Sequence, residues 1–414
     1  MKRTTTPPVI VGIRELEAAF RVGLESARPK TRKKAGDNAR MIATLSHAMQ
    51  SLRAEKQHPG VMVTSRDATA SLLQTYLARQ AHKTGKIAKA SGGGLEAKFD
   101  NNDILGWAGS FFTWWRRIIP ARIIKASTKP LPMPNRARLA LFSDWATGLY
   151  GAPEIQKAIE SDGDFQVVMH LGDTYYSGDD DEIRDRLLKF FPNVGGAQRF
   201  ALNGNHEMYT GGRSYFGDAL PALGQKSSYF ALQNDNWLLL GLDSAHTDHD
   251  LSSDQANWVH TMVDNAEGRK VILFSHHQPI SLLERQGPRL IEKLGDLLDR
   301  KKIFAWYWGH EHRCLLHDKH PIWGMYGRCI GHGGFPYFRD DLGNAPAAVG
   351  PFRRLDSRDL VPGGLVLDGE NPYIPGHERE YGPHGYVAVE LDGDKMNEVI
   401  HDASGAKLLE QELT

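Results

Sequence analysis

Residues 165–176 read Phe-Gln-Val-Val-Met-His-Leu-Gly-Asp-Thr-Tyr-Tyr. An apolar run of strand length ends there in a glycine and is followed by polar residues. Four other apolar runs end in a similar way, and helical stretches alternate with them, which predicts a layered α/β domain with mixed sheets. The segments that follow these four runs are Ser143-Asp144-Trp145, Asn203-Gly204-Asn205-His206-Glu207, His276-His277-Gln278-Pro279 and Gly309-His310-Glu311-His312.

The polar residues after these strands suit a metal centre. In open α/β sheets, ligands gather at the carboxyl ends of strands, so five successive strand ends bring Asp, Asn and His side chains to one rim. Carboxylates, imidazoles and an amide oxygen suit borderline or hard metal ions. Two ions about 3.5–4 Å apart, bridged by a carboxylate, polarise a phosphoryl group and lower the pKa of a bound water. The pattern therefore indicates a metal-dependent hydrolase.

The order of the motifs is Asp…Gly-Asp-x-x-Tyr…Gly-Asn-His-Glu…His…Gly-His-x-His, and it resembles the calcineurin-like metallophosphoesterase superfamily. Most of that superfamily opens with Asp-x-His, but Ala146 stands two residues after Asp144. The purple acid phosphatase branch has a tyrosine in its second motif instead, and Tyr176 stands at that spacing. The chain departs from this branch at Ser143 and Thr147, where the branch has glycine. The resemblance covers about residues 137–335 and implies an α-β-β-α sandwich.

The resemblance also implies two metal sites that share one carboxylate. The first site would use Asp144, Asp173, Tyr176 and His312, with iron as the expected ion. The second would use Asp173, Asn205, His276 and His310, with iron, manganese or zinc. The neighbouring His277 is the alternative to His276 as a ligand, because both follow the same strand. Asp173 would bridge the two ions, and a hydroxide that also bridges them would attack phosphorus in line. His206 would contact phosphate or aid the leaving group.

Four further residues are candidates for substrate contact. His332 follows a predicted strand in Ile330-Gly-His-Gly-Gly334, and Tyr209 and Arg213 lie in a glycine-rich loop after His206. His277 would face the substrate if His276 binds the metal. For His332 the alternative is a turn histidine without a role in binding. The pair His246 and His249 is interpreted as part of a solvated loop rather than as a metal site.

The charge of the chain is balanced in total but not along its length. There are 50 Lys+Arg and 50 Asp+Glu, yet residues 1–130 hold 23 basic and 9 acidic residues, a net +14 that the rest offsets. Residues 1–36 are expected to be a mobile basic segment, 37–130 a helical basic region, and 131–414 the phosphoesterase domain with a long loop insertion at 341–384. The aromatic stretch 104–119 either packs against the next domain or lies on anionic lipid.

These features leave three functions open. The first is hydrolysis of phosphomonoesters or phosphodiesters. The second is a nucleic-acid or cyclic-nucleotide phosphodiesterase guided by the basic region. The third is a phosphoesterase tethered by residues 1–130 to an anionic membrane or a protein partner. The two cysteines exclude a disulfide framework, and neither a signal peptide nor a transmembrane stretch is visible, so a cytoplasmic location is expected, with peripheral membrane association left open.

Overall fold

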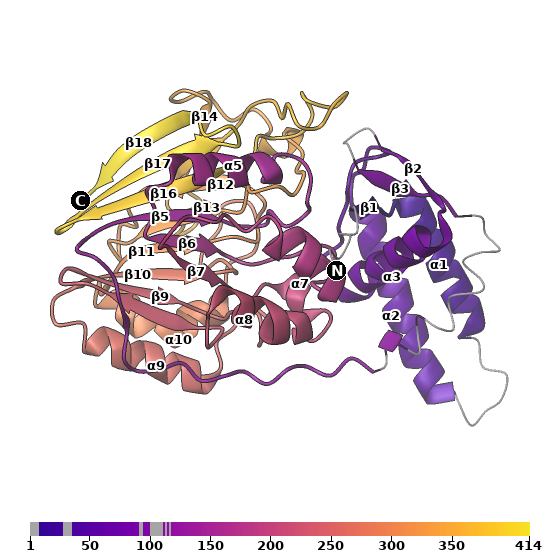
Figure 1. The fold of residues 1–414 in the computed structure, drawn as a ribbon, viewed down its shortest axis with the longest axis horizontal. Coiled ribbons are helices and arrows are strands. Elements are labelled where there is room, and N and C mark those ends of the chain that lie inside the picture. The colour runs from indigo at the N-terminus through magenta and orange to yellow at the C-terminus, as the bar shows by residue number, and fades with distance from the viewer. Residues whose placement is uncertain (1–7, 28–34, 91–93, 100–110, 112–113, 116) are drawn as a thin grey trace.

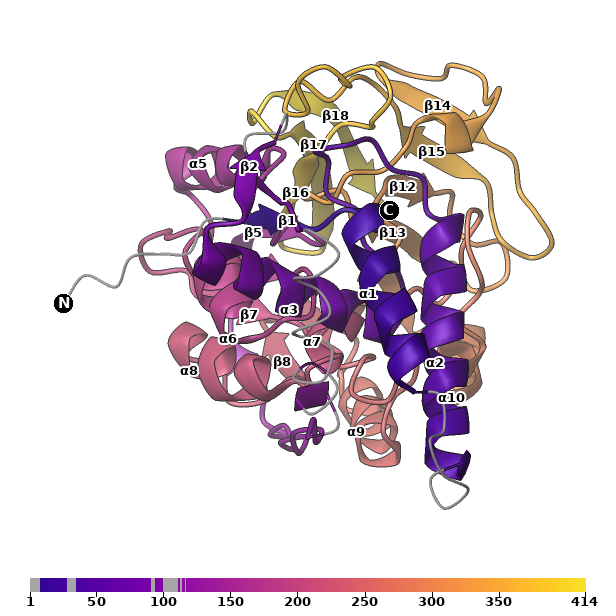
Figure 2. The same ribbon diagram turned by 90° about the vertical axis from the view of Figure 1, so that its right-hand side faces the viewer.

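The computed structural model describes residues 8–27, 35–90, 94–99, 111, 114–115 and 117–414. They form a large body of two sheets and a smaller, mainly helical region beside it (Figure 1). Figure 2 shows the same arrangement with the smaller region toward the viewer. None of the described helices is long and apolar enough to cross a membrane.

One sheet of the large body has six strands. Their order is β18-β17-β16-β5-β6-β7, so the last three strands of the chain extend the sheet beside β5. β5, β6 and β7 run parallel, while β16, β17 and β18 pair antiparallel. The strands are β5 (Arg136–Phe142), β6 (Val167–His170), β7 (Gln198–Ala201), β16 (Gly385–Asp392), β17 (Lys395–Asp402) and β18 (Lys407–Leu413).

The second sheet has nine strands in the order β14-β15-β12-β13-β11-β10-β9-β8-β4. β9, β10, β11 and β13 run parallel at its centre. The expectation of a long loop at 341–384 is wrong in part, because β14 and β15 lie in this segment and pair with the sheet. The strands are β4 (Leu131–Pro132), β8 (Phe230–Gln233), β9 (Trp237–Gly241), β10 (Lys270–Ser275), β11 (Ile303–Trp308), β12 (Cys314–His317), β13 (Tyr326–Ile330), β14 (Phe352–Leu355) and β15 (Gly364–Leu367).

Apolar side chains of both sheets meet between them and form the central core. Leu139 and Val389 come from the six-stranded sheet, and Leu239 and Phe274 from the other. Helix α5 (Ala152–Asp162) packs on the outer face of the six-stranded sheet. α9 (Ser253–Asp264) and α10 (Pro288–Asp299) cover the nine-stranded sheet. The expected α-β-β-α layering is thus confirmed.

Short helical segments fill the connections between these layers. Five of them surround the loops after β6 and β7, and one follows β13. They are α6 (Asp180–Glu182), the π-helix Ile183–Leu188, α7 (Asn205–Met208), the π-helix Tyr215–Ala219, α8 (Leu220–Leu223) and the 3-10 helix Asp340–Leu342. α7 begins at Asn205, so the third strand-end motif of the sequence forms a helix start.

The smaller region, here called the N-terminal region, contains α1 (Ile13–Ser26), α2 (Ala35–Ala54) and α3 (Ala68–Thr84) with the small sheet β1 (Val9–Ile10), β3 (Leu95–Ala97) and β2 (Ile87–Lys89). Its own core includes Leu16, Phe20, Leu45 and Leu73. The prediction of a mobile segment at 1–36 is wrong for β1 and α1, because their apolar residues are buried in this core.

The aromatic stretch 104–119 lies largely outside the described residues. Of its described part, Phe111 is buried, and Trp114 and Trp115 pack against the core of the N-terminal region. The ring of Tyr76 on α3 lies 5.6 Å from that of Phe111. These aromatic residues therefore pack within the N-terminal region rather than against the next domain, and the contacts give the lipid surface no support.

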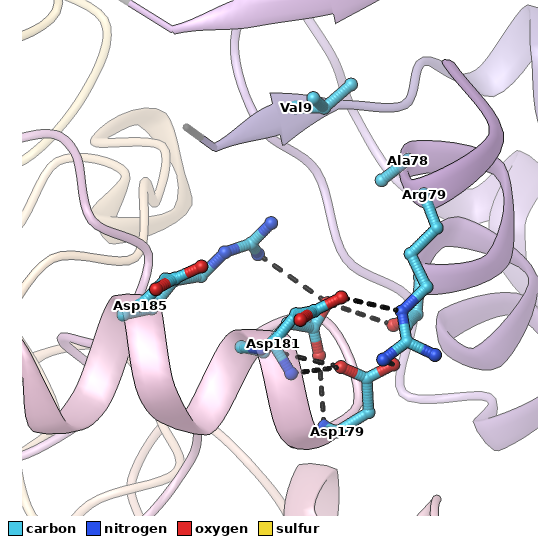
Figure 3. Close-up of a pocket in the computed structure, with 9 residues that line it drawn as sticks. Val9, Ala78, Arg79, Asp179, Asp181 and Asp185 are labelled. Atoms are coloured by element: carbon cyan, nitrogen blue, oxygen red, sulfur yellow. Dashed lines mark hydrogen bonds and ion pairs between the residues drawn. The ribbon is translucent and has the colours of Figure 1, made fainter. Parts of the chain in front are cut away.

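The N-terminal region docks on the large body through ion pairs and buried polar contacts. Arg79 of α3 reaches the acidic start of α6, with 2.9 Å to Asp179 and 3.3 Å to Asp181 (Figure 3). Lys56 lies 2.7 Å from Asp340 across the same interface. Basic residues of the N-terminal region thus meet acidic residues of the same chain. The anionic partner that the charge asymmetry suggested gains no support from these contacts.

Candidate metal centre

The loops after β5, β6, β7, β10 and β11 converge at one end of the sandwich. These loops carry the residues that the sequence motifs singled out, which are Asp144, Asp173, Asn205, His276, His310 and His312. Asp144, Asp173, His310 and His312 all have positive φ, between 55° and 74°. Non-glycine residues rarely adopt this conformation, and such residues cluster at functional sites. The backbone is therefore bent at the proposed ligands themselves.

The first group of ligand atoms comes from Asp144, Asp173 and His312. Their nearest donor atoms lie within 4.8 Å of one another. The hydroxyl of Tyr175 joins this group, since it lies 2.9 Å from Asp144 Oδ1, 2.8 Å from His312 Nε2 and 3.4 Å from Asp173 Oδ2. Two carboxylates, an imidazole and a phenol form a donor set that fits a hard or borderline cation.

Tyr176, which the motif spacing assigned to this site, lies elsewhere. Its hydroxyl accepts a hydrogen bond from the Val11 amide at 3.1 Å and donates to the Val9 carbonyl at 3.4 Å. The adjacent tyrosines thus point to opposite sides of the loop. Tyr175 reaches the metal ligands, while Tyr176 holds the N-terminal strand. The sequence contained both tyrosines but no signal that could tell their directions apart.

The second group comes from Asp173, His276 and His310, and Asp173 is common to both groups. The Asn205 side-chain oxygen lies 3.0 Å from His276 Nε2 and 3.0 Å from His310 Nδ1. His276 Nδ1 lies 2.9 Å from the Leu171 carbonyl, so Nδ1 donates and Nε2 is the nitrogen that faces Asn205, Asp173 and the centre. This arrangement matches the ligand set that the resemblance implied.

His277 points away from the Asp173 carboxylate. Its Nδ1 lies 3.1 Å from the Ser244 hydroxyl, and its ring lies 3.8 Å from that of His249. The structure thus favours His276 over His277 for the second group. His249, assigned from the sequence to a solvated loop, instead forms a third cluster with His277 and His310. Its partner in that pair, His246, bonds to the Ala121 carbonyl at 2.9 Å.

Burial sets the charges of the site. It raises the pKa of Asp144 to about 7, with the neighbouring Asp173 adding to the effect. Burial alone would lower the pKa of His276, but the Asp173 carboxylate outweighs it and raises the value to about 9. For Asp173, burial is outweighed by His276 and His206, so its pKa lies below the usual range. A buried carboxylate is stabilised by a positive charge beside it, so Asp144 and Asp173 are suited to bind a metal ion.

Hydrogen bonds from neighbouring groups orient the two carboxylates. Ser143 Oγ donates to Asp144 Oδ2 at 2.7 Å, and the His310 amide donates to the same oxygen at 2.9 Å. Ser143, which departs from the family glycine, therefore supports the ligand instead of crowding it. Thr147, the other departure, bonds to backbone carbonyls, among them that of Gly334 at 3.3 Å.

The loop around Asp173 needs a glycine and a buried glutamate. Glu207 Oε2 accepts the amides of Asp173 at 3.2 Å and Gly204 at 2.9 Å. A Cβ on Gly204 would lie 2.1 Å from Asp173 Oδ1, closer than any real contact. The glycine of the Gly-Asn-His-Glu motif thus allows the backbone to approach Asp173 closely, and the glutamate holds the loop of Asp173, the carboxylate common to both ligand groups.

The proposed substrate contacts divide into two groups. His206 Nε2 lies 3.8 Å from Asp173 Oδ2, and the Tyr209 hydroxyl bonds to the Asn205 side chain at 2.7 Å. Arg213 is exposed, while His332 is completely buried, and neither lines a described cavity near the centre. The structure brings His206 and Tyr209 to the centre and leaves Arg213 and His332 outside it.

Two cavities open beside the ligands. A cleft of about 1050 Å³ is lined by Asn205, His249 and His310, and a cavity of about 260 Å³ by His312. Arg66 of the N-terminal region lines both, and Arg285 and Arg289 line the larger one. Residues outside the motif region thus form part of the wall around the centre.

Comparison with known proteins finds one matching family model and several similar solved structures. Residues 137–314 match the family of calcineurin-like phosphoesterases. No protein with a curated description matches the chain. Among solved structures, a purple acid phosphatase from yellow lupin (Lupinus luteus) is 14% identical over 68% of this chain and 55% of its own, with a TM-score of 0.47. GAP50, the anchor in the inner membrane complex of Plasmodium, is 11% identical over 67% of this chain and 89% of its own, with a TM-score of 0.48.

The chain thus spans little more than half the length of the lupin phosphatase. The matched family segment contains every proposed metal ligand, including Tyr175, which takes the place that the motif spacing assigned to Tyr176. Residues 137–314 are thus similar to the calcineurin-like phosphoesterases.

Proposed function

We propose that this protein hydrolyses phosphomonoesters or phosphodiesters at a binuclear metal centre. The observation that supports the proposal most directly is Asp173, which belongs to two ligand groups at once. The family supports a metal-dependent phosphoester hydrolase and implies two metal ions. Bound there, the two ions would lower the pKa of a water and offset charge on the phosphoryl oxygens.

The ligands would be shared between the two metal ions as follows. Asp144, Tyr175 and His312 would hold one ion, and Asn205, His276 and His310 the other, with Asp173 shared. A phenol oxygen among the ligands favours iron in the first site, as in a purple acid phosphatase, with iron, manganese or zinc in the second.

His206 is the proposed acid or phosphate contact. Its Nδ1 is hydrogen-bonded to the Tyr176 carbonyl, which leaves Nε2 facing the centre. Burial lowers the pKa of His206 despite the nearby Asp173 carboxylate. Because the carbonyl only accepts, Nδ1 carries the proton, so Nε2 of the neutral imidazole accepts a hydrogen bond and would donate to phosphate or a leaving group only after it is protonated. Its ring is held between those of Tyr175, 4.6 Å away, and Tyr209, 4.7 Å away.

The large cleft favours an anionic substrate. Arg66, Arg285 and Arg289 line it, although Arg66 already donates to both carboxylate oxygens of Glu284, and Asp248 offsets a further part of the positive charge. Guanidinium groups bind phosphate oxygens through paired hydrogen bonds. The cleft volume of about 1050 Å³ leaves room for a leaving group larger than a water molecule. Both a monoester and a diester fit this description.

The test combines metal analysis with hydrolysis of p-nitrophenyl phosphate and bis(p-nitrophenyl) phosphate. The wild-type protein should bind two metal ions per chain and cleave at least one substrate. The variant Asp173→Asn should lose metal and lose more than about 100-fold in kcat/KM, since even outer-shell changes cost about 10–100-fold. Asp264→Asn, at an exposed site on α9, is the matched control. Full activity and full metal content in Asp173→Asn would refute the binuclear assignment.

A further inference from the structure

A second cluster of metal-binding residue types lies at the interface of the N-terminal region, apart from the centre described above. It joins His58, in the loop between α2 and α3, to His377 and Glu380, in the loop between β15 and β16. One ligand atom of each residue lies within 4.8 Å of the other two. The side chains are partly accessible, at 30%, 23% and 46%. An ion from solvent can therefore reach them.

The three side chains lie against one another, with the rings of His58 and His377 stacked 4.1 Å apart. The Glu380 amide donates to the His377 carbonyl at 3.0 Å, a turn that places both side chains on one side. His377 Nδ1 lies 3.1 Å from Glu380 Oε1, and His58 Nε2 contacts the other carboxylate oxygen. One carboxylate thus lies between two imidazoles that are more than 300 residues apart in the sequence.

We propose that His58, His377 and Glu380 bind a divalent cation of the zinc class, separate from the catalytic ions. Two imidazoles with one carboxylate form a known type of zinc ligand set, in which water occupies the fourth position. Imidazole nitrogens select zinc and its neighbours over magnesium or calcium. The rings of Phe338 and Tyr381, 5.6 Å and 5.9 Å from His58, shield one side of the cluster.

The position of the cluster suggests what the ion would do. His58 precedes the segment whose residues Met62, Thr64 and Arg66 line the cavity of about 260 Å³ beside His312. The ion would tie this segment to the catalytic body next to the Lys56–Asp340 ion pair. Because a bound ion stabilises only the state in which its ligands are assembled, it would favour the docked N-terminal region.

The experiment uses the full-length protein with its catalytic metals in place. Wild type, His58→Ala, His377→Ala and the control His82→Ala, which removes an exposed histidine at the end of α3, are equilibrated with zinc and desalted. Elemental analysis and thermal unfolding with and without added zinc are then measured. We expect both cluster variants to bind one zinc ion fewer per chain than wild type and His82→Ala.

The same two variants should also lose the zinc-dependent rise in unfolding temperature that wild type shows. His58→Ala changes the N-terminal region and His377→Ala changes the large body. If one variant fails to fold, the zinc content of the other still tests the proposal. Equal zinc content in wild type and both variants would overturn the proposal, whether or not the catalytic centre binds its own ions. A loss of zinc in His82→Ala as well would mean adventitious surface binding and would also overturn it.

Discussion

Replacing each of the two adjacent tyrosines by phenylalanine tests whether Tyr175, rather than Tyr176, is the metal ligand. Tyr175→Phe removes a hydroxyl that contacts Asp144 and His312 at 2.9 and 2.8 Å. If that oxygen is a metal ligand, the metal affinity of the first site should fall by more than the roughly 10–100-fold that outer partners contribute. Activity should fall in parallel. Burial and the Asp144 carboxylate raise the pKa of Tyr175 well above its usual range, so a cation is needed to displace its proton.

Tyr176→Phe should have a different effect. Its hydroxyl accepts from the Val11 amide, so the change leaves a buried donor unpaired at a cost of about 1–3 kcal/mol in the free energy of unfolding. Metal content and kcat should stay near those of wild type. Both variants are compared by elemental analysis, p-nitrophenyl phosphate hydrolysis and denaturant unfolding. With iron bound, a visible phenolate band should be lost in Tyr175→Phe alone. If Tyr176→Phe loses metal while Tyr175→Phe keeps it, the assignment of Tyr175 is refuted.

Three other predictions follow from contacts outside the centre. Arg66→Met removes a guanidinium from both cavities and should raise KM about tenfold with little change in kcat, which corresponds to about 1.4 kcal/mol of substrate binding. An unchanged KM in steady-state kinetics would contradict a role of Arg66 in substrate binding. Arg328→Met, which leaves Glu398 buried without its 2.7 Å partner, should cost about 3–5 kcal/mol in the free energy of unfolding, measured by denaturant titration against wild type. Burial and the nearby Glu182 raise the pKa of Asp179 from 3.8 to about 8 against the opposing effect of Arg79, whose charged partner at lower pH is Asp181, with its lowered pKa. The folded state then binds more protons, so stability should fall as pH rises between these values. Asp179→Asn should show a flatter dependence, and an unchanged slope of unfolding temperature against pH would contradict the shift.

The ligand positions could be predicted because they depend on a short-range rule. A strand ended by glycine and a polar residue places that residue at the rim of the sheet, and this holds for Asp173 and His310 alike. The choice between His276 and His277 needed the structure. The choice between Tyr175 and Tyr176 also needed the structure. Side chains in a loop do not alternate regularly as they do in a strand, so the sequence does not show which way each one points. His249 was assigned from the sequence to a solvated loop, and the fold of that loop, which brings its ring 3.8 Å from that of His277, could not be predicted.

The N-terminal region was harder to interpret because its charges were counted without their partners. Arg79 and Lys56 contribute to a net +14 that suggested an external anion, yet both face carboxylates of the large body. Pairing between residues 100 or more positions apart leaves no trace in local composition. In the same way, β1 and α1 read as a polar segment, although Leu16 and Phe20 are buried in a core supplied by later helices.

The order of the six-stranded sheet has a consequence for cutting the chain. β5, which leads to Asp144, lies between β6 and β16, and β16 begins only at Gly385. A fragment trimmed to residues 137–314 would keep every proposed ligand yet expose the free edge of β5, an edge that invites pairing with other chains. Such a fragment should aggregate rather than fold. The shortest segment that matches the family is therefore not the shortest segment that can be made as a stable enzyme.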